Sequence, residues 1–152
     1  MTGRVWVVHG PNLNLIGTHR NPNTYGSATL PELNERIRAE ASDLGLEVQF
    51  FQANQEGALV DIIQASFDAA DAVVLNPAAY GHTSVALRDA VEASPNPVIE
   101  VHLSQPEARE TFRHTSILAG VVAGRIAGFG ALSYLLALHA ASALVARRGN
   151  TD

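Results

Sequence analysis

The spacing of Glu100 and His102 predicts a pair of side chains that could exchange protons with a ligand. They lie two positions apart in an apolar run, and residues i and i+2 of a strand point to the same face of a sheet. The carboxylate can then hold one imidazole nitrogen and fix its tautomer, while the other nitrogen faces a ligand. The alternative is a structural histidine near the end of a sheet. No second histidine or carboxylate stands at a metal-ligand spacing, so a metal site is not expected.

A tyrosine and an arginine close together, Tyr25 and Arg20, form a second candidate pair. A tyrosine rarely acts as a base unless neighbouring cations stabilise its phenolate. Arginine suits that task because it stays charged and does not compete for the proton. Taken alone, the pair could equally be a tyrosine that closes a loop and an arginine on the surface.

Two further groups could bind an anionic or hydroxyl-rich ligand. The loop 76–84, which includes His82, leads into an expected helix, and the free backbone amides of a helix start bind anions. Arg109 and Arg113 lie four positions apart, so on one helix they would face the same site and clamp a carboxylate. Plain helix capping and a solvated helix face are the alternatives for these two groups.

Apolar runs precede most of these residues and predict the strands of a sheet. Strands that alternate with helices predict a doubly wound parallel α/β sheet with helices on both faces. Such sheets bind ligands beyond the carboxyl ends of their strands, which is where the polar residues collect. The expected strands are 5–8, 47–51, 72–75, 98–101 and 121–123, and the expected helices are 30–44, 56–70, 83–93, 106–111 and 129–146.

The loop from His9 to Gly26 is too long for an ordinary strand-to-helix connection, which takes about 2–6 residues. Long loops inside compact domains commonly carry function, and glycines bracket the distal half of this one. We therefore expect an active-site loop whose second half is a mobile lid.

The composition is typical of one globular domain, with 152 residues, 47% hydrophobic and 16% charged. We expect a single catalytic domain over residues 1–148 and a short tail at 149–152. A net charge of −5 without a basic run argues against nucleic acid as a partner. No signal peptide is visible, and Arg125 and several glycines interrupt the apolar segment 117–146. We therefore expect a cytoplasmic protein that does not span a membrane.

Lysine and cysteine are both absent from the chain. Without lysine, the protein cannot form a Schiff base with a carbonyl compound and has no P-loop lysine. Without cysteine, it has no disulfide and no thiolate nucleophile. Any carbonyl chemistry must therefore be non-covalent or use another nucleophile.

Taken together, several stretches resemble the type II 3-dehydroquinate dehydratases (type II dehydroquinases). The resemblance extends from about residue 5 to residue 146 and rests on several specific motifs in the same order. They are GPNLNLIG at 10–17, Arg20 with Pro22 and Tyr25-Gly26, NPAAYGHTSVALRDA at 76–90, IEVHLS at 99–104 and ARETFRH at 108–114.

The resemblance implies a flavodoxin-like domain with a five-stranded sheet and no cofactor, built into trimers that assemble as a dodecamer. The implied activity is that of a hydro-lyase, the reversible anti elimination of water from 3-dehydroquinate to give 3-dehydroshikimate through an enolate. This reaction serves either the shikimate pathway to chorismate and aromatic amino acids or the breakdown of quinate.

The family's site residues carry over to matching positions of this sequence. The resemblance implies that Tyr25 removes the C2 proton, that Arg20 stabilises its phenolate, and that His102, held by Glu100, protonates the departing C1 hydroxyl. Asn12 would position a water that stabilises the enolate oxygen. The implied substrate-binding residues are Asn76, His82, Leu103, Ser104 and Arg113, with Asp89 reaching in from a neighbouring subunit.

The chain departs from the family pattern at a few positions. The family usually has one residue between the loop glycine and Arg20, whereas this chain has two, Thr18 and His19. Gly81 stands where threonine is common, and Gln105 stands where asparagine is common. The altered lid leaves a catalytically impaired relative as one alternative. A flavodoxin-like module that binds a small ligand such as a flavin or nucleotide is the other.

Overall fold

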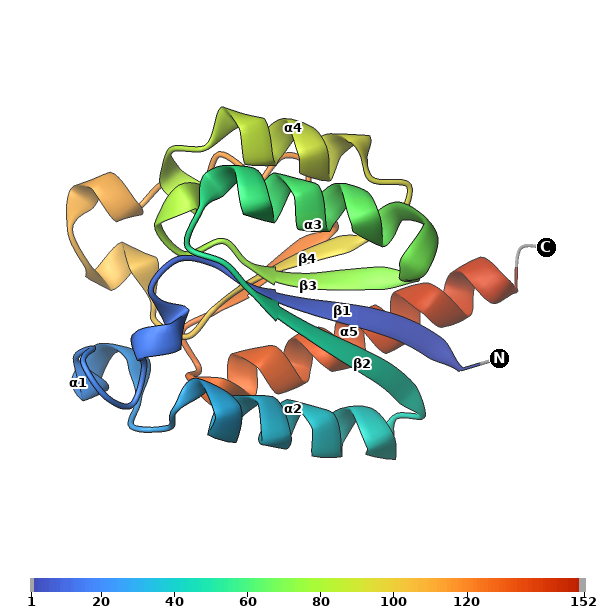
Figure 1. Cartoon of the computed structure of the whole chain (residues 1–152), viewed down its shortest axis with the longest axis horizontal. Coiled ribbons are helices and arrows are strands. Elements are labelled where there is room, and N and C mark those ends of the chain that lie inside the picture. Colours follow the sequence, from blue (N-terminus) through green and yellow to red (C-terminus); the bar gives the residue numbers. More distant parts are fainter. Residues whose placement is uncertain (1, 151–152) are drawn as a thin grey trace.

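The computed structural model describes residues 2–150, and within them five parallel strands form one sheet in the order β2-β1-β3-β4-β5 (Figure 1). Because all four neighbouring pairs are parallel, every strand has its carboxyl end at the same edge of the sheet. The expected doubly wound α/β fold is confirmed. The strands are β1 Gly3–His9, β2 Leu46–Gln52, β3 Ala72–Asn76, β4 Val98–His102 and β5 Gly124–Ala127.

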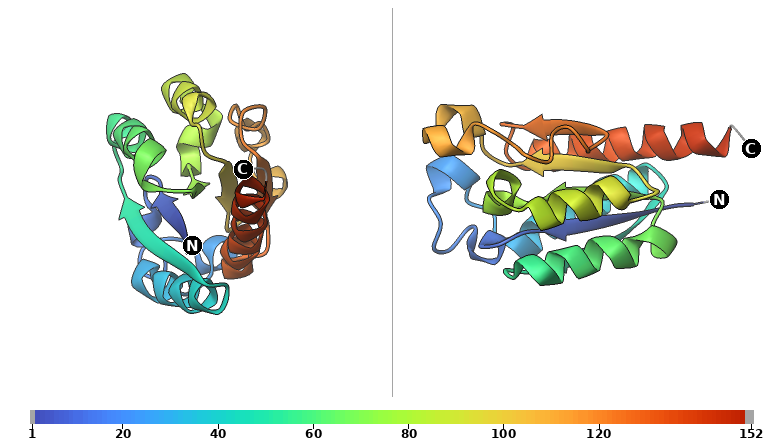
Figure 2. Two further views of the ribbon diagram at one scale, coloured as in Figure 1. Left: turned by 90° about the vertical axis from the view of Figure 1, so that its right-hand side faces the viewer. Right: turned by 90° about the horizontal axis from the view of Figure 1, so that it is seen from above.

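Two helices cover each face of the sheet and enclose a core on either side (Figures 1 and 2). Helices α2 and α5 pack on one face, and α3 and α4 pack on the other. Strand β3 is fully buried because helices cover it on both faces, which explains its uniformly apolar sequence. The helices are α2 Leu30–Asp43, α3 Glu56–Ala69, α4 Val85–Ala93 and α5 Ala131–Gly149.

The remaining short helices all follow strand ends at the carboxyl edge, which makes this edge the irregular part of the molecule. The long loop after β1 contains two of them, so it is not an extended connection. They are η1 Leu13–Leu15, α1 Pro22–Tyr25, η2 Ala78–His82, η3 Pro106–Ala108 and η4 Thr111–Arg113.

The chain leaves the neighbouring strands β1 and β3 toward opposite faces of the sheet (Figure 1), and residues that follow both strands line a crevice there. The backbone after β1 approaches the backbone after β3 closely, and Gly10 donates its N–H to the carbonyl of Asn76 at 2.8 Å. A Cβ atom at Gly10 would lie 2.7 Å from the carbonyl oxygen of Pro77, so only glycine fits there. This contact fixes the two loops that flank the crevice.

Local signals set the start of the helices on either side of this crevice. Helix α2 begins with a capping box, in which Thr29 and Glu32 each accept a backbone N–H of the other. Ser84 caps α4 by accepting the N–H of Leu87 at 2.9 Å. Helix capping, the alternative interpretation of the loop 76–84, is therefore confirmed at Ser84.

The strand expected at 121–123 was wrong by three residues, because β5 is Gly124–Ala127. An edge strand is covered on fewer sides than a central strand, and residues of β5 are exposed or half-buried, so it lacks a continuous apolar run. Val121 and Val122 are apolar for a different reason, since they pack against the core from a turn.

Two expected helices also differ from the structure. The region 106–111 forms no single helix, because Arg109 is extended between η3 and η4. Helix α5 begins at Ala131 instead of residue 129, since Gly130 has a positive φ of 60°. It continues to Gly149, three residues beyond the expected end at 146.

The described ends of the chain both lie on the side of the amino edge of the sheet, opposite the crevice (Figure 2). A Cβ atom at Gly3 in β1 would lie 3.2 Å from the side chain of Val145 in α5. None of the helices within residues 2–150 is both long and apolar enough to cross a bilayer. The division into a domain at 1–148 and a tail stays a prediction, and residues 151–152 of that tail lie outside the described part.

Candidate active site

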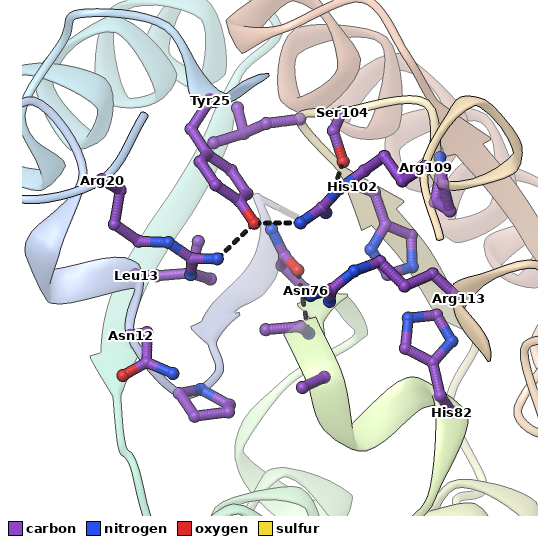
Figure 3. A pocket seen from close by; sticks show the side chains of 15 residues that line it. Asn12, Leu13, Arg20, Tyr25, Asn76, His82, His102, Ser104, Arg109 and Arg113 are labelled. Atoms are coloured by element: carbon purple, nitrogen blue, oxygen red, sulfur yellow. Dashed lines mark hydrogen bonds between the residues drawn. The ribbon is translucent and has the colours of Figure 1, made fainter. Parts of the chain in front are cut away.

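A cavity of about 130 Å³ lies in the crevice at the carboxyl edge of the sheet (Figure 3). Its walls come from the loops after β1 and β3, from the end of β4, and from η3 and η4. Of the residues expected in the site, all but Glu100 and Asp89 line it. The lining residues are Pro11, Asn12, Leu13, Arg20, Tyr25, Asn76, Ala78, Ala79, His82, His102, Leu103, Ser104, Pro106, Arg109 and Arg113.

The hydroxyl of Tyr25 lies between two guanidinium groups at one end of the cavity (Figure 3). Arg20 donates a hydrogen bond to it and also stacks on the ring, with its Cζ 3.8 Å from the ring centroid. Arg109 donates to the same oxygen at 2.5 Å. Two guanidinium groups therefore face any negative charge that develops on this oxygen, and neither competes for its proton.

Arg109 is the link between this tyrosine and the wall of the cavity formed by β4 and its loop. Besides Tyr25, it contacts Ser104, whose hydroxyl accepts a second N–H of the guanidinium at 3.1 Å. The sequence suggested that Arg109 and Arg113 act together from one helix, but they lie in different turns. Arg113 lines the cavity while its Nε donates to Glu110 at 3.0 Å. Both arginines reach the cavity, but only Arg109 contacts the tyrosine.

Glu100 and His102 form the pair that strand alternation predicts. The carboxylate of Glu100 accepts a hydrogen bond from Nε2 of His102 at 2.5 Å. Within the described residues, every buried side-chain nitrogen or oxygen has a hydrogen-bond partner, and Nδ1 of His102 has none. Nδ1 must therefore reach the open cavity, where it could give a proton to a ligand.

Two more groups hold Glu100, which has no exposed surface. Ser116 donates to Oε1 at 2.7 Å, and Nε of Arg125 lies 3.2 Å from Oε2. Burial alone would raise the pKa of Glu100, but the hydrogen bonds from His102 and Ser116 and the charge of Arg125 outweigh it and lower that pKa. The carboxylate therefore stays ionised although it is buried.

Asn76 is held in place by a buried network beneath the cavity. Its Nδ2 donates to the hydroxyl of Tyr134 at 2.9 Å, and its Oδ1 accepts the N–H of Ala78 at 3.0 Å. The same hydroxyl lies 3.0 Å from Nδ1 of His9, and Nε2 of His9 lies 2.8 Å from Oδ1 of Asn34. Since Asn34 accepts at that oxygen, Nε2 carries the proton and Nδ1 accepts from Tyr134.

Burial controls the protonation of this network. It lowers the pKa of His9 to about 4, against a smaller opposing effect of the hydrogen bond to Asn34. It also raises the pKa of the fully buried Tyr134, so its hydroxyl keeps its proton. Both side chains are neutral near pH 7, and the orientation of the Asn76 amide is fixed.

Two non-glycine residues of the cavity wall have positive φ angles, Asn12 at 67° and Ala78 at 51°. Asparagine tolerates this conformation, and the N–H of Asn12 is anchored to Oδ1 of Asn54 at 3.0 Å. The N–H of Ala78 is likewise anchored, to Oδ1 of Asn76, but alanine has no polar side chain that favours this conformation, so Ala78 carries backbone strain. Strained backbone on both flanks of a cavity is common where a ligand must be positioned.

Leu103, His82 and Asp89 complete the set of expected site residues. Leu103 is buried in the cavity wall, and its carbonyl accepts the N–H of Gly130 at 2.9 Å. His82 faces the cavity, and its Nδ1 lies 2.8 Å from the carbonyl of Thr115. Asp89 is exposed on α4 in a separate shallow pocket, so it takes no part in the cavity of its own chain.

Several residues of the site and its support were missed or misread from the sequence. In the sequence Arg125 only interrupts an apolar segment, and Ser116 belongs to no recognisable pattern, yet both contact Glu100. His9 and Tyr134 are 125 positions apart, so no local spacing could connect them. Among the described residues, no three His, Asp or Glu side chains form a group that could hold a metal, and the expectation of a metal-free site stays a prediction.

The chain is similar to proteins of one family over nearly its whole length. Residues 3–142 match the family model described as Dehydroquinase class II. The chain is 51% identical over 144 residues to the 3-dehydroquinate dehydratase of Desulforudis audaxviator, with 95% of each chain covered. It is 53% identical over 144 residues to that of a Chelativorans species, with 94% of this chain and 99% of the other covered. The crystal structure of the type II dehydroquinase from Propionibacterium acnes has a TM-score of 0.90 at 38% identity, covering 94% of this chain and 98% of that one.

Proposed function

The chain belongs to the class II dehydroquinase family, and from this premise we propose that it converts 3-dehydroquinate to 3-dehydroshikimate by reversible anti elimination of water. The observation that supports this chemistry best is that one cavity presents a tyrosine hydroxyl held by two guanidinium groups and a histidine held by a buried carboxylate. A base and an acid on separate walls match a reaction that removes a proton and a hydroxyl from opposite faces.

Tyr25 acts as the base in this proposal. As a phenolate stabilised by Arg20 and Arg109, it takes the C2 proton of the ketone and leaves an enolate. The enolate oxygen needs a hydrogen-bond donor, which would be a water held by Asn12. Because the chain lacks lysine, the carbonyl cannot be activated as an imine, so the enolate has to be stabilised without a covalent bond.

His102 acts as the acid in the second step. Its protonated Nδ1 gives a proton to the C1 hydroxyl, the C1–O bond breaks, and water leaves as the C1–C2 double bond forms. Glu100 orients the imidazole through Nε2. General acid–base groups of this kind each contribute about 10²–10⁴-fold to the rate. Before the next cycle, the Tyr25 hydroxyl loses its proton to solvent and Nδ1 of His102 takes a proton from solvent.

The remaining cavity residues bind the substrate in this proposal. Arg113 suits its carboxylate, since a guanidinium is a favourable partner for a planar anion. Asn76, His82, Ser104 and the backbone at Leu103 face the same space and suit its hydroxyl groups. No metal and no cofactor takes part.

We further propose that the chain assembles into trimers that form a dodecamer. Two observations support association with other copies. Asp89 lies away from its own cavity, so it could serve only the cavity of a neighbour. Phe112 and Phe129 are 67% and 62% exposed, and an interface with another copy would remove both rings from water. A cytoplasmic location and a place in the shikimate pathway or quinate breakdown belong to the same proposal.

The proposed activity has a direct optical test. Elimination conjugates the product's double bond with its ketone, so the ultraviolet absorbance must rise when 3-dehydroquinate is added to the protein. Quinate, which has no ketone to acidify C2, is the matched control and must give no signal. Adding borohydride together with the substrate must leave the activity intact because no imine forms. No absorbance change with 3-dehydroquinate would overturn the proposal.

A further inference from the structure

The carboxylate of Glu100 has a third partner, Arg125, whose role the elimination chemistry does not require. Arg125 lies on β5 directly opposite Glu100 on β4 in the register of the parallel pair. Its Nε is 3.2 Å from Oε2, the same oxygen that accepts the hydrogen bond from His102 at 2.5 Å. One carboxylate oxygen therefore links a permanent cation and the histidine.

Arg125 is separate from the cavity, although it is close to the acid. It is not among the residues that line the cavity, and its side chain is 28% exposed on the edge strand. Glu100 stands between it and the ring of His102. Any effect of Arg125 on turnover must therefore act through the Glu100–His102 pair.

A buried carboxylate with a histidine as its sole charged partner would create a difficulty in each catalytic cycle. When the imidazolium gives up a proton, the carboxylate loses its cation and remains as a lone buried charge, which is unfavourable. Before the transfer, the carboxylate would therefore compete for the Nε2 proton of the imidazolium, and its loss would leave a neutral imidazole that is a much weaker acid at Nδ1. A guanidinium keeps its charge throughout, so it removes this competition.

We propose that Arg125 is a positioning residue that keeps Glu100 ionised throughout the cycle, so that His102 keeps its Nε2 proton and gives its Nδ1 proton to the leaving hydroxyl. The inference rests on the proposed role of His102 as the acid. In this arrangement Glu100 orients the imidazole without over-stabilising its protonated form, because part of its negative charge is already balanced by Arg125.

The charges around the pair come from several elements and must be considered together. Ser116, in the segment before β5, donates to the other carboxylate oxygen of Glu100 and is uncharged. Asn76, from β3, is also uncharged. The titratable and charged groups on the cavity side are Arg109 and Arg113 from the η3–η4 region, His82 from η2, and Tyr25 and Arg20 from the loop after β1. Arg125 is the cation that contacts Glu100 itself.

The pH dependence of turnover tests the proposal. In Arg125→Gln the unbalanced charge of Glu100 holds the proton on His102 more tightly. The alkaline limb of the kcat profile should then move up by about one pH unit, and the plateau should fall about tenfold. KM should stay within about twofold because Arg125 does not touch the cavity. Arg125→Lys retains the charge and should restore the limb.

The controls separate a charge effect from a structural one. Arg38→Gln removes an exposed arginine that pairs with Glu35 on α2, far from the pair, and should leave the profile unchanged. Thermal unfolding must show that each variant is folded. Arg125→Met keeps the apolar stem on the strand and serves as a second neutral variant should the glutamine variant not fold.

A measurement without substrate makes the test independent of turnover. The ring nitrogen signals of His102, followed by NMR, should titrate at a higher pH in the neutral variants than in the wild type. In Arg125→Lys they should titrate at the same pH as in the wild type. If folded neutral variants shift neither the NMR titration nor the kcat limb, the inference fails while the proposed function stands. If the wild type forms no 3-dehydroshikimate, the proposed function fails instead.

Discussion

The two halves of the site are built in different ways. The acid half lies on the sheet, where Glu100 and His102 are neighbours on one face of β4 and are nearly or fully buried. The base half lies on loops, where half-buried Tyr25 meets Arg20 from its own loop and Arg109 from a segment 84 positions away. The first half needs only a strand, whereas the second needs two loops to be folded and held together.

This difference indicates how stability and activity are divided in the molecule. Side chains on or beneath the strands should affect both unfolding and turnover, because they are part of the packed sheet. Side chains on the loops should affect turnover with little effect on unfolding, because they add few buried contacts. The following variants test that division, beginning with the largest expected effect.

Tyr25→Phe should lower kcat by at least about 10³-fold, which corresponds to about 4 kcal/mol of lost transition-state stabilisation. The ring and its stacking on Arg20 remain, so KM and the melting temperature should change little. Steady-state kinetics and thermal unfolding measure both quantities. Tyr80→Phe is the matched control, since its hydroxyl contacts the carbonyl of Asn54 and not the cavity. Near-normal turnover by the Tyr25 variant would show that Tyr25 is not the base.

A buried side chain of the sheet, His9 at the end of β1, should make the free energy of unfolding fall as the pH falls from 6.5 to 4. Burial lowers the pKa of His9 to about 4 in the native state, so in this range the unfolded chain binds a proton that the native protein does not. The stabilisation is complete above pH 6.5 and is lost as the pH falls, by about 3 kcal/mol.

Urea unfolding at pH 7, 5.5 and 4 checks this dependence on pH. His9→Gln removes the titrating group and should flatten this part of the profile. His19→Gln, on the exposed loop, should keep the wild-type profile. An equal loss of stability in the wild type and the His9 variant would assign the pH dependence to other groups.

Arg109→Gln tests whether the contact between the two loops matters. It removes one of the two guanidinium groups on the Tyr25 oxygen and the hydrogen bond to Ser104. Hydrogen bonds to charged groups contribute about 1.5–3 kcal/mol, so kcat should fall about 10–10²-fold. Because Arg109 also lines the cavity, KM should rise as well. A change in KM with kcat unaltered would mean that Arg20 alone serves the tyrosine.

Ala78→Gly should give the smallest effect and the opposite sign. The left-handed conformation of Ala78 costs about 1–2 kcal/mol, and glycine adopts it without that cost. After allowing for the greater freedom of glycine in the unfolded chain, we expect a gain of about 1 kcal/mol in the free energy of unfolding. Urea unfolding measures it. A loss of stability would show that the surrounding loop relieves the strain at Ala78.

The sequence predicted the sheet half of the site better than the loop half. Strand alternation was enough to pair Glu100 with His102, and their contact is confirmed. The contact of Tyr25 with Arg20 is also confirmed, although both residues lie on a loop whose short helices were not expected. Their catalytic roles come from the resemblance and stay predictions, as does the opening of the loop as a lid.

What the sequence could not predict depends on contacts between distant segments. Arg109 was assigned to one helix with Arg113, but the extended backbone at Arg109 separates them. Arg125 follows an apolar run, and its position opposite Glu100 depends on the register between β4 and β5, which the sequence does not specify. Edge strands and buried networks such as that of His9 and Tyr134 carry no local period from which they could be identified.

The position of both chain ends on the side opposite the cavity has a practical consequence. Gly3, the first residue of β1, packs against the side chain of Val145, at the opposite end of the strand from the cavity. A tag or surface linker attached to either terminus would therefore leave the cavity of that chain open to solvent.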